Sequence, residues 1–227
     1  MNNLKIIGSI NQGNEFIFIE EYYNINDKSF IYIARNEKEI FQLSEKLKWI
    51  LPSAKILLFR SWNQIPYDNV SPSKEIQSER IKTLFEILNT KEKHIIITSV
   101  NAIIQKTVNK EFIKNNFIEI YENKLISFEE IINKIFFLGY QRTSLVREKS
   151  EFAVRGSIID IFISYKKNPI RIDFFDDKID NIYEFDKISQ KKIKKINNKI
   201  IINASSEILL NKDTLNSFRK NFRKIFV

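Results

Sequence analysis

The stretch FIYIARNEKEIFQLSEKLKWILPSAKILLF, residues 30–59, decides the fold class of this chain. It begins and ends with short apolar runs, at 30–34 and 55–59, which are typical of strands buried in a parallel sheet. Between the two runs, apolar residues recur near helical spacing over 36–50, so the sequence predicts an amphipathic helix that connects the strands. The order strand, helix, strand indicates an α/β fold.

The same pattern continues along the chain. An amphipathic stretch at 73–88 precedes a third apolar run at 94–98. Asn36 and Ser73 stand where N-capping residues are expected, and each is followed by acidic residues in the first turns. We therefore expect residues 1–115 to form one domain built on a doubly wound parallel sheet.

After residue 115 the pattern changes to strands with little helix between them. One helix is predicted at 127–138, with Gly139 as its terminating residue. The strands that follow are predicted at 152–155, 157–163, 170–175, 179–185 and 193–202. Such a succession predicts a second, smaller α+β domain with an antiparallel sheet, which we place at residues 116–205.

Two turn sequences set the expected order of these strands. Residues 166–169 and 176–178 are rich in turn-forming residues, so the middle strands should form an antiparallel meander. The basic run at 191–199 is expected to be a solvated strand edge, since charged edges discourage pairing between sheets. A final helix is predicted at about 213–225, within a C-terminal segment that spans 206–227.

The composition of the 227 residues excludes several classes of protein. An apolar content of 43% with 29% charged residues supports a folded core and argues against a disordered tail. No apolar run approaches the roughly 20 residues of a bilayer span, so we expect a cytoplasmic protein without direct membrane contact. The chain has no cysteine and a single histidine, His94, and we therefore expect neither a disulfide nor a zinc site.

The net charge of +9 has two explanations. Clustered Lys and Arg bind phosphate backbones by releasing counterions, which would point to nucleic acid. A chain dominated by Ile, Lys and Asn, with only four Gly and four Pro, is also what an AT-rich genome produces by codon drift. Because no base-reading motif accompanies the charge, we expect nucleic-acid binding to be at most weak and non-specific.

The loop GSINQGNEF at residues 8–16 lies where an α/β nucleotide-binding domain would have its phosphate loop. A working loop needs a lysine for the phosphate charge and a hydroxyl for magnesium. Glu15 and Phe16 occupy those two positions here, and a carboxylate would repel the phosphate. We therefore expect no nucleotide cofactor and no ATPase activity from this loop.

Carboxylates in the second domain are the remaining candidates for a metal site or an acid–base pair. They are Asp160, Asp173, Asp176, Asp177 and Asp180. Strand alternation and turn placement scatter them, whereas hard cations need several oxygens at one point, so turn-forming and ion-pair roles are favoured. His94 lies inside an apolar strand and is expected to be a hydrogen-bonded core residue. We identify no catalytic residues and no metal ligands.

The predicted strand at 170–175 has two different faces. Alternation places Arg171, Asp173 and Phe175 on one face, and the isoleucines on the other face belong to the core. Arg155 ends a neighbouring predicted strand and could share the charged face. Arginine mixed with an exposed aromatic residue is typical of protein interface hot spots. The alternative is a solvated ion pair between Arg171 and Asp173, with Phe175 tucked into a turn.

Four segments carry a resemblance to a known family. They are WNQIPYDNVSP at 62–72, GYQR at 139–142, EFAVRGSIIDIF at 151–162 and IRIDFFDDKID at 170–180. In order and spacing they resemble the N-terminal, UvrB-like module of bacterial transcription-repair coupling factors (Mfd). The last three blocks are similar to the UvrB-interaction domain, domain 2, which UvrB shares with that family.

The resemblance covers about Leu4 to Ile225 and implies a fold and a partner. It implies that 1–115 is a RecA-like domain 1a without a functional phosphate loop and that 116–205 is a UvrA-binding domain 2. Residues 206–227 would begin the link to further domains. Three residues identical to the family's UvrA contacts are expected to bind UvrA: Arg155 and Arg171 by pairing with acidic groups, and Phe175 by filling an apolar pocket.

The resemblance also limits what this chain is expected to do. The family's parent protein is an ATP-dependent DNA translocase, but the translocase and RNA polymerase-binding domains are not part of this sequence. We therefore expect a non-enzymatic fragment that binds UvrA and reaches RNA polymerase only through domains absent from it. The rival hypothesis is a UvrB-like excision-repair protein that binds ATP and damaged DNA.

Overall fold

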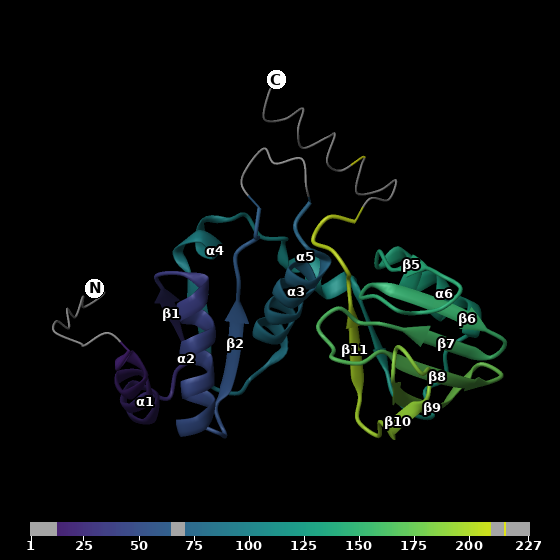
Figure 1. Ribbon diagram of the computed structural model, residues 1–227, viewed down its shortest axis with the longest axis horizontal. Helices are drawn as coiled ribbons and strands as arrows, with labels where there is room; N and C mark the ends of the chain where they lie inside the picture. The colour runs from purple at the N-terminus through teal and green to yellow at the C-terminus, as the bar shows by residue number, and fades with distance from the viewer. Residues whose placement is uncertain (1–12, 65–70, 210–215, 217–227) are drawn as a thin grey trace. The chain divides into compact units, whose positions relative to one another are not determined.

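The structure, a computed structural model, describes residues 13–64, 71–209 and 216 (Figure 1). The chain divides into two compact units, one formed by residues 1–61 with 89–106 and the other by 62–88 with 107–227. These units are spatial groupings, so the expected sequence modules at 1–115, 116–205 and 206–227 remain a prediction. The expected mixed α/β fold with a parallel and an antiparallel sheet is confirmed.

The first unit is built on a three-stranded parallel sheet. Its strand order is β1–β3–β2, with bounds β1 Phe30–Ala34, β2 Lys55–Phe59 and β3 His94–Ser99. All six residues of the central strand β3 are buried, as expected for a strand with neighbours on both sides. Helix α2 (Glu37–Ile50) contributes its buried Ile40, Leu43 and Leu47 to the same core. The three strands and this helix match the sequence prediction.

Helix caps form where the sequence predicts them. The Asn36 side chain accepts a hydrogen bond of 3.0 Å from the backbone N–H of Glu39 at the start of α2. The Ser73 hydroxyl accepts one of 3.3 Å from Ile76 at the start of α3 (Lys74–Asn89). The first unit also contains α1 (Glu15–Ile25) and α4 (Val100–Ile104).

The second unit contains a six-stranded sheet in the order β10–β9–β8–β7–β6–β5. The bounds are β5 Gln141–Arg142, β6 Glu151–Arg155, β7 Ile158–Ile161, β8 Ile170–Phe175, β9 Lys178–Phe185 and β10 Lys192–Lys195. Strands β6 to β10 pair antiparallel with their chain neighbours, which confirms the predicted meander. The turn between β8 and β9 contains Asp176 at a positive φ of 52°, a conformation that Asp tolerates.

Helix α6 (Phe128–Phe137) matches the predicted helix and packs into the core of the second unit. Gly139 follows it with φ +86°, as a helix-terminating glycine does. A Cβ at this position would lie 2.8 Å from Ser205 Oγ and 2.9 Å from a methyl group of Leu209. Only glycine therefore fits both the backbone conformation and the space.

The predicted single strand at 193–202 is wrong. It is two strands, because β10 ends at Lys195 and β11 (Ile200–Asn203) pairs antiparallel with β4 (Phe117–Ile120) in a separate two-stranded sheet. The segment between them contains Asn197 and Asn198, and asparagine favours turns over strands. Strand β4 and the short helix α5 (Lys110–Asn115), which precedes it, were not predicted.

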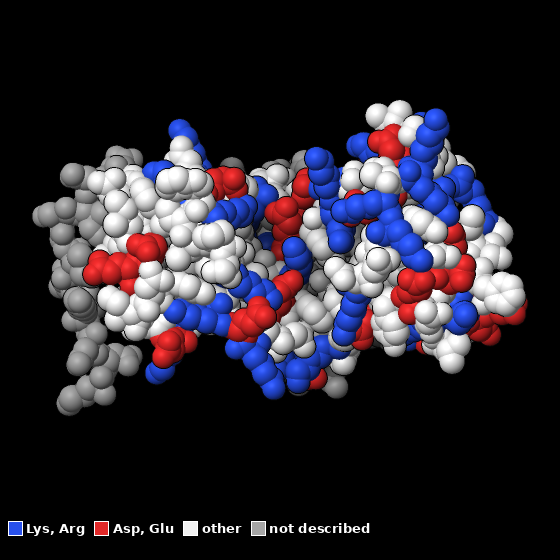
Figure 2. Space-filling view, turned by 90° about the horizontal axis from the view of Figure 1, so that it is seen from below, with Lys and Arg blue, Asp and Glu red and all other residues white. Residues whose placement is uncertain are grey.

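The basic run at 191–199 lies on the edge strand and beyond it, and all four residues of β10 are exposed, which confirms the predicted solvated edge. Four of its five lysines have acidic partners. The ion pairs are Lys192–Asp173, Lys194–Glu184, Lys195–Glu122 and Lys199–Glu119. On the face seen in Figure 2, Lys and Arg are more numerous than Asp and Glu, and the two kinds of charge lie interspersed.

Some predictions fall outside the described residues. These are the final helix at 213–225 apart from residue 216, loop residues 8–12 and the middle of the 62–72 segment, residues 65–70. Within the described ranges, no helix is long and apolar enough to cross a membrane.

Candidate functional site

The candidate site is the charged face of the six-stranded sheet, and strand β8 shows it most directly. Burial alternates along this strand, with Ile170, Ile172 and Phe174 buried and the intervening residues more exposed. Phe175 is 68% exposed at the end of the strand. The predicted division of this strand into a core face and a surface face is confirmed.

The register of the sheet brings Arg155 onto the same face. Asp160 on β7 pairs with Arg171 on β8, and Arg155 on β6 pairs with Ile158, which in turn pairs with Asp173. Residues directly opposite one another in an antiparallel ladder point to the same side of the sheet. The two arginines and Phe175 therefore share one face, as the sequence predicts.

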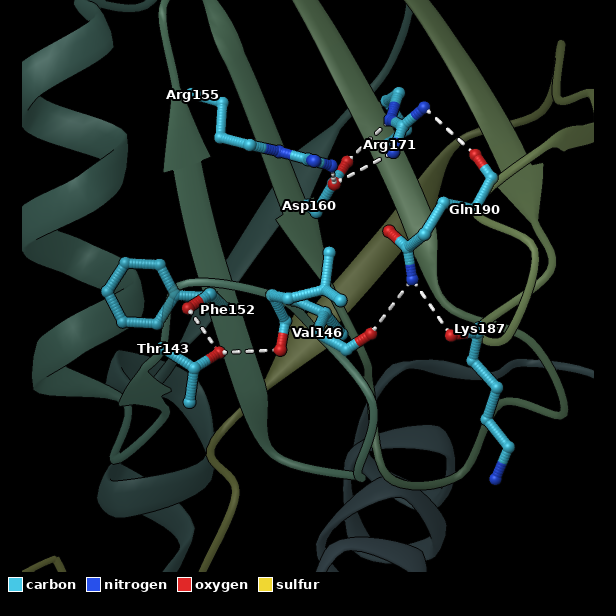
Figure 3. Close-up of polar contacts among 9 residues, drawn as sticks. Thr143, Val146, Phe152, Arg155, Asp160, Arg171, Lys187 and Gln190 are labelled. Carbon is cyan, nitrogen blue, oxygen red and sulfur yellow. Dashed lines mark hydrogen bonds and ion pairs between the residues drawn. The ribbon is translucent and has the colours of Figure 1, made fainter.

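A buried carboxylate joins the two arginines (Figure 3). Asp160 is 1% exposed, and it accepts hydrogen bonds from Arg171 Nε to Oδ1 at 2.7 Å and from Arg171 Nη2 to Oδ2 at 2.9 Å. Arg155 Nη2 donates to the same Oδ2. Such bidentate, charge-assisted hydrogen bonds are among the strongest polar contacts in proteins. The hydrogen bonds to Asp160 also raise the pKa of the Arg171 guanidinium.

Arg171 is held from its other side as well. Its Nη1 donates to the backbone oxygen of Gln190 at 3.3 Å, and its guanidinium lies 4.7 Å from the ring centre of Phe185. The Gln190 side chain donates in turn to the backbone oxygens of Val146 at 3.3 Å and Lys187 at 2.8 Å (Figure 3). Figure 3 thus shows Arg171 enclosed by a hydrogen-bonded network.

The two arginines differ in how much of them a partner could reach. The side chain of Arg155 is 45% exposed, whereas that of Arg171 is 12% exposed. Arg155 binds Asp160 through one amino group, while Arg171 uses three nitrogens in the network. Arg155 is therefore the arginine that a partner can reach more readily.

The alternative ion pair between Arg171 and Asp173 is not what forms. Arg171 binds Asp160, and Asp173 pairs with Lys192 at 2.7 Å. Phe175 is exposed rather than tucked into a turn. The face therefore presents an aromatic side chain beside paired charges.

Asp160 is the site residue that the sequence did not single out. The sequence placed it among scattered carboxylates with turn-forming or ion-pair roles. Its position in the middle of an apolar strand, where a lone carboxylate is costly, was the available signal for a buried ion pair. In the described part of the chain, no three His, Cys, Asp or Glu side chains come together as metal ligands would.

In the described part of the 8–16 segment, residues 13–16, Glu15 is the first residue of helix α1. Its carboxylate accepts a 2.8 Å hydrogen bond from the backbone N–H of Gly13 and lies 3.4 Å from Arg35 Nη2. Lys46 lies nearby, with its ammonium group 5.0 Å from the centre of the Phe16 ring. Glu15 thus places a negative charge against the backbone of this loop.

The remaining candidates from the sequence, His94 and the 62–72 segment, make internal polar contacts. His94 is buried, and its Nδ1 lies 3.1 Å from the Ser29 hydroxyl and 2.9 Å from the backbone oxygen of Glu92, which confirms a hydrogen-bonded core residue. In the described part of the 62–72 segment, Trp62 Nε1 donates to Glu207 at 3.1 Å, and Arg80 pairs with the same carboxylate at 2.5 Å.

Comparison with known proteins shows what the chain is similar to. Residues 118–206 match the family model described as the UvrB interaction domain. The transcription-repair-coupling factor of Rickettsia bellii is 29% identical over 93% of this chain, and that of Rickettsia conorii is 31% identical over 93%. The one from Haemophilus influenzae is 29% identical over 99% of the chain.

The match covers only part of each relative, because the chain spans 19% of the length of each of these three coupling factors. The candidate site, from Arg155 to Phe175, lies inside the segment that matches the family model. Residues 118–206 are therefore similar to a UvrB interaction domain, and the chain is similar, over nearly its whole length, to part of the transcription-repair-coupling factors.

Proposed function

We propose that the charged face of the six-stranded sheet binds UvrA, and that the chain serves as the UvrA-docking module of a transcription-repair coupling factor. The observation that carries the proposal is the pair of arginines held by Asp160 beside the exposed Phe175, on a sheet that matches the UvrB interaction domain. In a complete coupling factor, this docking would link a stalled RNA polymerase to nucleotide excision repair.

The chemistry of the face suits protein binding. Phe175 exposes most of its ring to water, and full burial of such a side chain in a partner's pocket contributes about 1.5–3 kcal/mol. The Arg155 side chain is half-exposed, and its guanidinium can pair with an acidic group of the partner. An aromatic anchor with a neighbouring arginine is the composition enriched at interface hot spots.

We assign the first unit a supporting role, as a RecA-like domain without nucleotide chemistry. Its parallel sheet supports this assignment, and so does the Glu15 carboxylate, which would repel a phosphate. We propose no catalytic activity and no cofactor for this chain. Translocation and RNA polymerase binding would belong to other parts of a protein whose relatives are about five times as long.

Isothermal titration calorimetry with UvrA tests the proposal. Phe175→Ala is expected to weaken binding by about 2 kcal/mol or more, roughly thirtyfold, because the exposed aromatic anchor is lost. Phe137→Ala is the matched control, since Phe137 is also an exposed phenylalanine but lies on α6 rather than on the charged face. Equal affinities for both variants and the unmodified chain would exclude this face as the docking site.

The rival function is that of a UvrB-like protein that binds ATP and damaged DNA. Filter binding with labelled ATP and with damaged duplex DNA separates the two proposals. Tight binding of either ligand would favour the rival. The position of Glu15 at the described end of the 8–16 loop is the observation against it.

A further inference from the structure

We infer that Asp160 is a positioning residue of the docking face, which holds Arg155 in the orientation that a partner's carboxylate can bind. The inference rests on the proposed function, because its consequence is measured as UvrA affinity. It adds to that function a residue that is itself too buried to touch the partner, since Asp160 is 1% exposed.

The geometry makes Asp160 the single point where the two arginines meet. Its Oδ2 accepts from both Arg155 Nη2 and Arg171 Nη2, and its Oδ1 accepts from Arg171 Nε. Two guanidinium groups that share one carboxylate oxygen would repel each other if the carboxylate charge were removed. Arg155 lies on the exposed side of this arrangement and would then turn away into solvent, because Arg171 is fixed on its inner side.

Arg171 acts on the partner through Asp160 in this scheme. Its guanidinium is enclosed by Asp160, the Gln190 backbone and the Phe185 ring. Breaking a buried ion pair by removing one partner is costly, so the two hydrogen bonds from Arg171 hold the Asp160 carboxylate in place. Arg171 therefore fixes Asp160, and Asp160 fixes Arg155.

The balance of charge predicts what the partner brings. Two guanidinium groups and one carboxylate leave one positive charge uncompensated, and it lies on the accessible Arg155. The neighbouring Asp173 and Lys192 neutralise each other. The face thus fits a partner that offers one carboxylate next to an apolar pocket for Phe175.

A double-mutant cycle on UvrA binding tests the inference. Asp160→Asn keeps the shape of the side chain and removes its charge. In the unmodified chain it should weaken UvrA binding about tenfold, which is about 1.4 kcal/mol. In an Arg155→Ala chain the same change should weaken binding less than about twofold, because the side chain that Asp160 positions is already missing.

A matched control removes another carboxylate from the same sheet. Glu184 lies on β9 and pairs with Lys194, so Glu184→Gln makes the same change of charge away from the arginines. The affinity of the Glu184→Gln chain for UvrA should stay within about twofold of that of the unmodified chain. A loss as large as that of Asp160→Asn would mean that total charge, rather than the position of Arg155, controls binding, and the inference would fail.

The possible failures are distinguishable. If the unmodified chain does not bind UvrA, the proposed function itself is wrong. If it binds, and Asp160→Asn either has no effect or weakens binding equally with and without Arg155, only the inference is overturned. If Asp160→Asn fails to fold, Asp160→Glu replaces it, because this variant retains the charge but displaces it by one methylene group. The loss of UvrA affinity caused by Asp160→Glu must likewise disappear in the Arg155→Ala chain.

Discussion

At the scale of single residues, exposure and hydrogen bonding give the three expected UvrA contacts three different roles. Phe175 is an exposed anchor, Arg155 is half-exposed, and Arg171 lies inside a network around a buried carboxylate. Sequence alternation places all three on one face but cannot tell a buried arginine from an exposed one. The exposure of Arg171 depends on its hydrogen bond to the backbone oxygen of Gln190, which lies in a loop 19 positions further along the chain.

The two arginines should therefore differ in their effect on stability. Arg171→Ala should lower the free energy of unfolding by about 3 kcal/mol, because it leaves Asp160 buried with only Arg155 as a partner. Arg155→Ala should lower the free energy of unfolding by less than about 1 kcal/mol. The half-exposed Arg155 behaves much like an arginine in a surface ion pair, and such pairs contribute little to stability. Urea unfolding of both variants measures the difference. Equal destabilisation would contradict the separate roles.

At the scale of elements, the junctions between helices and strands depend on individual residues that the sequence partly reveals. The caps at Asn36 and Ser73 and the glycine after α6 were predicted correctly. The pairing of β11 with β4 was not, because the two strands are about 80 residues apart and the choice of a strand's partner depends on long-range packing.

Gly139 gives an element-scale prediction with an internal control. Gly139→Ala should destabilise the second unit by at least about 2 kcal/mol. Alanine is strained at this positive φ, and its Cβ would also lie too close to Ser205 and Leu209. Gly156→Ala has the strain, at φ +56°, but no neighbouring atom within 4 Å, so it should cost about 1 kcal/mol. Thermal unfolding compares the two, and a larger loss for Gly156→Ala would contradict the packing argument.

Glu39 at the start of α2 gives a prediction about pH. Burial alone would raise the pKa of its carboxyl, but hydrogen bonds from the Arg35 backbone and side chain and from Tyr32 lower it below the ordinary 4.5. A carboxyl with a lowered pKa in the folded state adds stability above pH 4.5 and loses it as the pH falls further. Urea midpoints measured across this range should fall less steeply with acid in Glu39→Gln. If the urea midpoint of Glu39→Gln fell with acid as steeply as that of the unmodified chain, this account would be contradicted.

At the scale of the whole molecule, the sequence predicted the fold class, three parallel strands and the antiparallel meander. These depend on local periodicity, which a single sequence contains. The grouping of α3 with the second unit was not predicted, because its buried Ile81 packs into a core built mainly from residues beyond 107. Of the site, the shared face was predicted, but the burial of Asp160 and its pairing with both arginines were not.

The net charge of +9 also belongs to this scale. Because four of the five lysines of the 191–199 run pair with acidic side chains, we expect only weak, non-specific DNA binding. Fluorescence anisotropy with a labelled duplex should show binding at low ionic strength that is lost by about 200 mM salt. Tight binding that persists at this salt concentration, or depends on sequence, would contradict the expectation.

The most direct test of the central claim is hydrogen–deuterium exchange of this chain with and without UvrA. The turns beside Arg155 and Phe175, at Gly156–Ser157 and Asp176–Asp177, lie at the end of the proposed docking face. The account predicts that UvrA slows exchange in these two turns and leaves the β10 edge unchanged. Unchanged exchange in both turns under saturating UvrA, or protection confined to other elements, would contradict it.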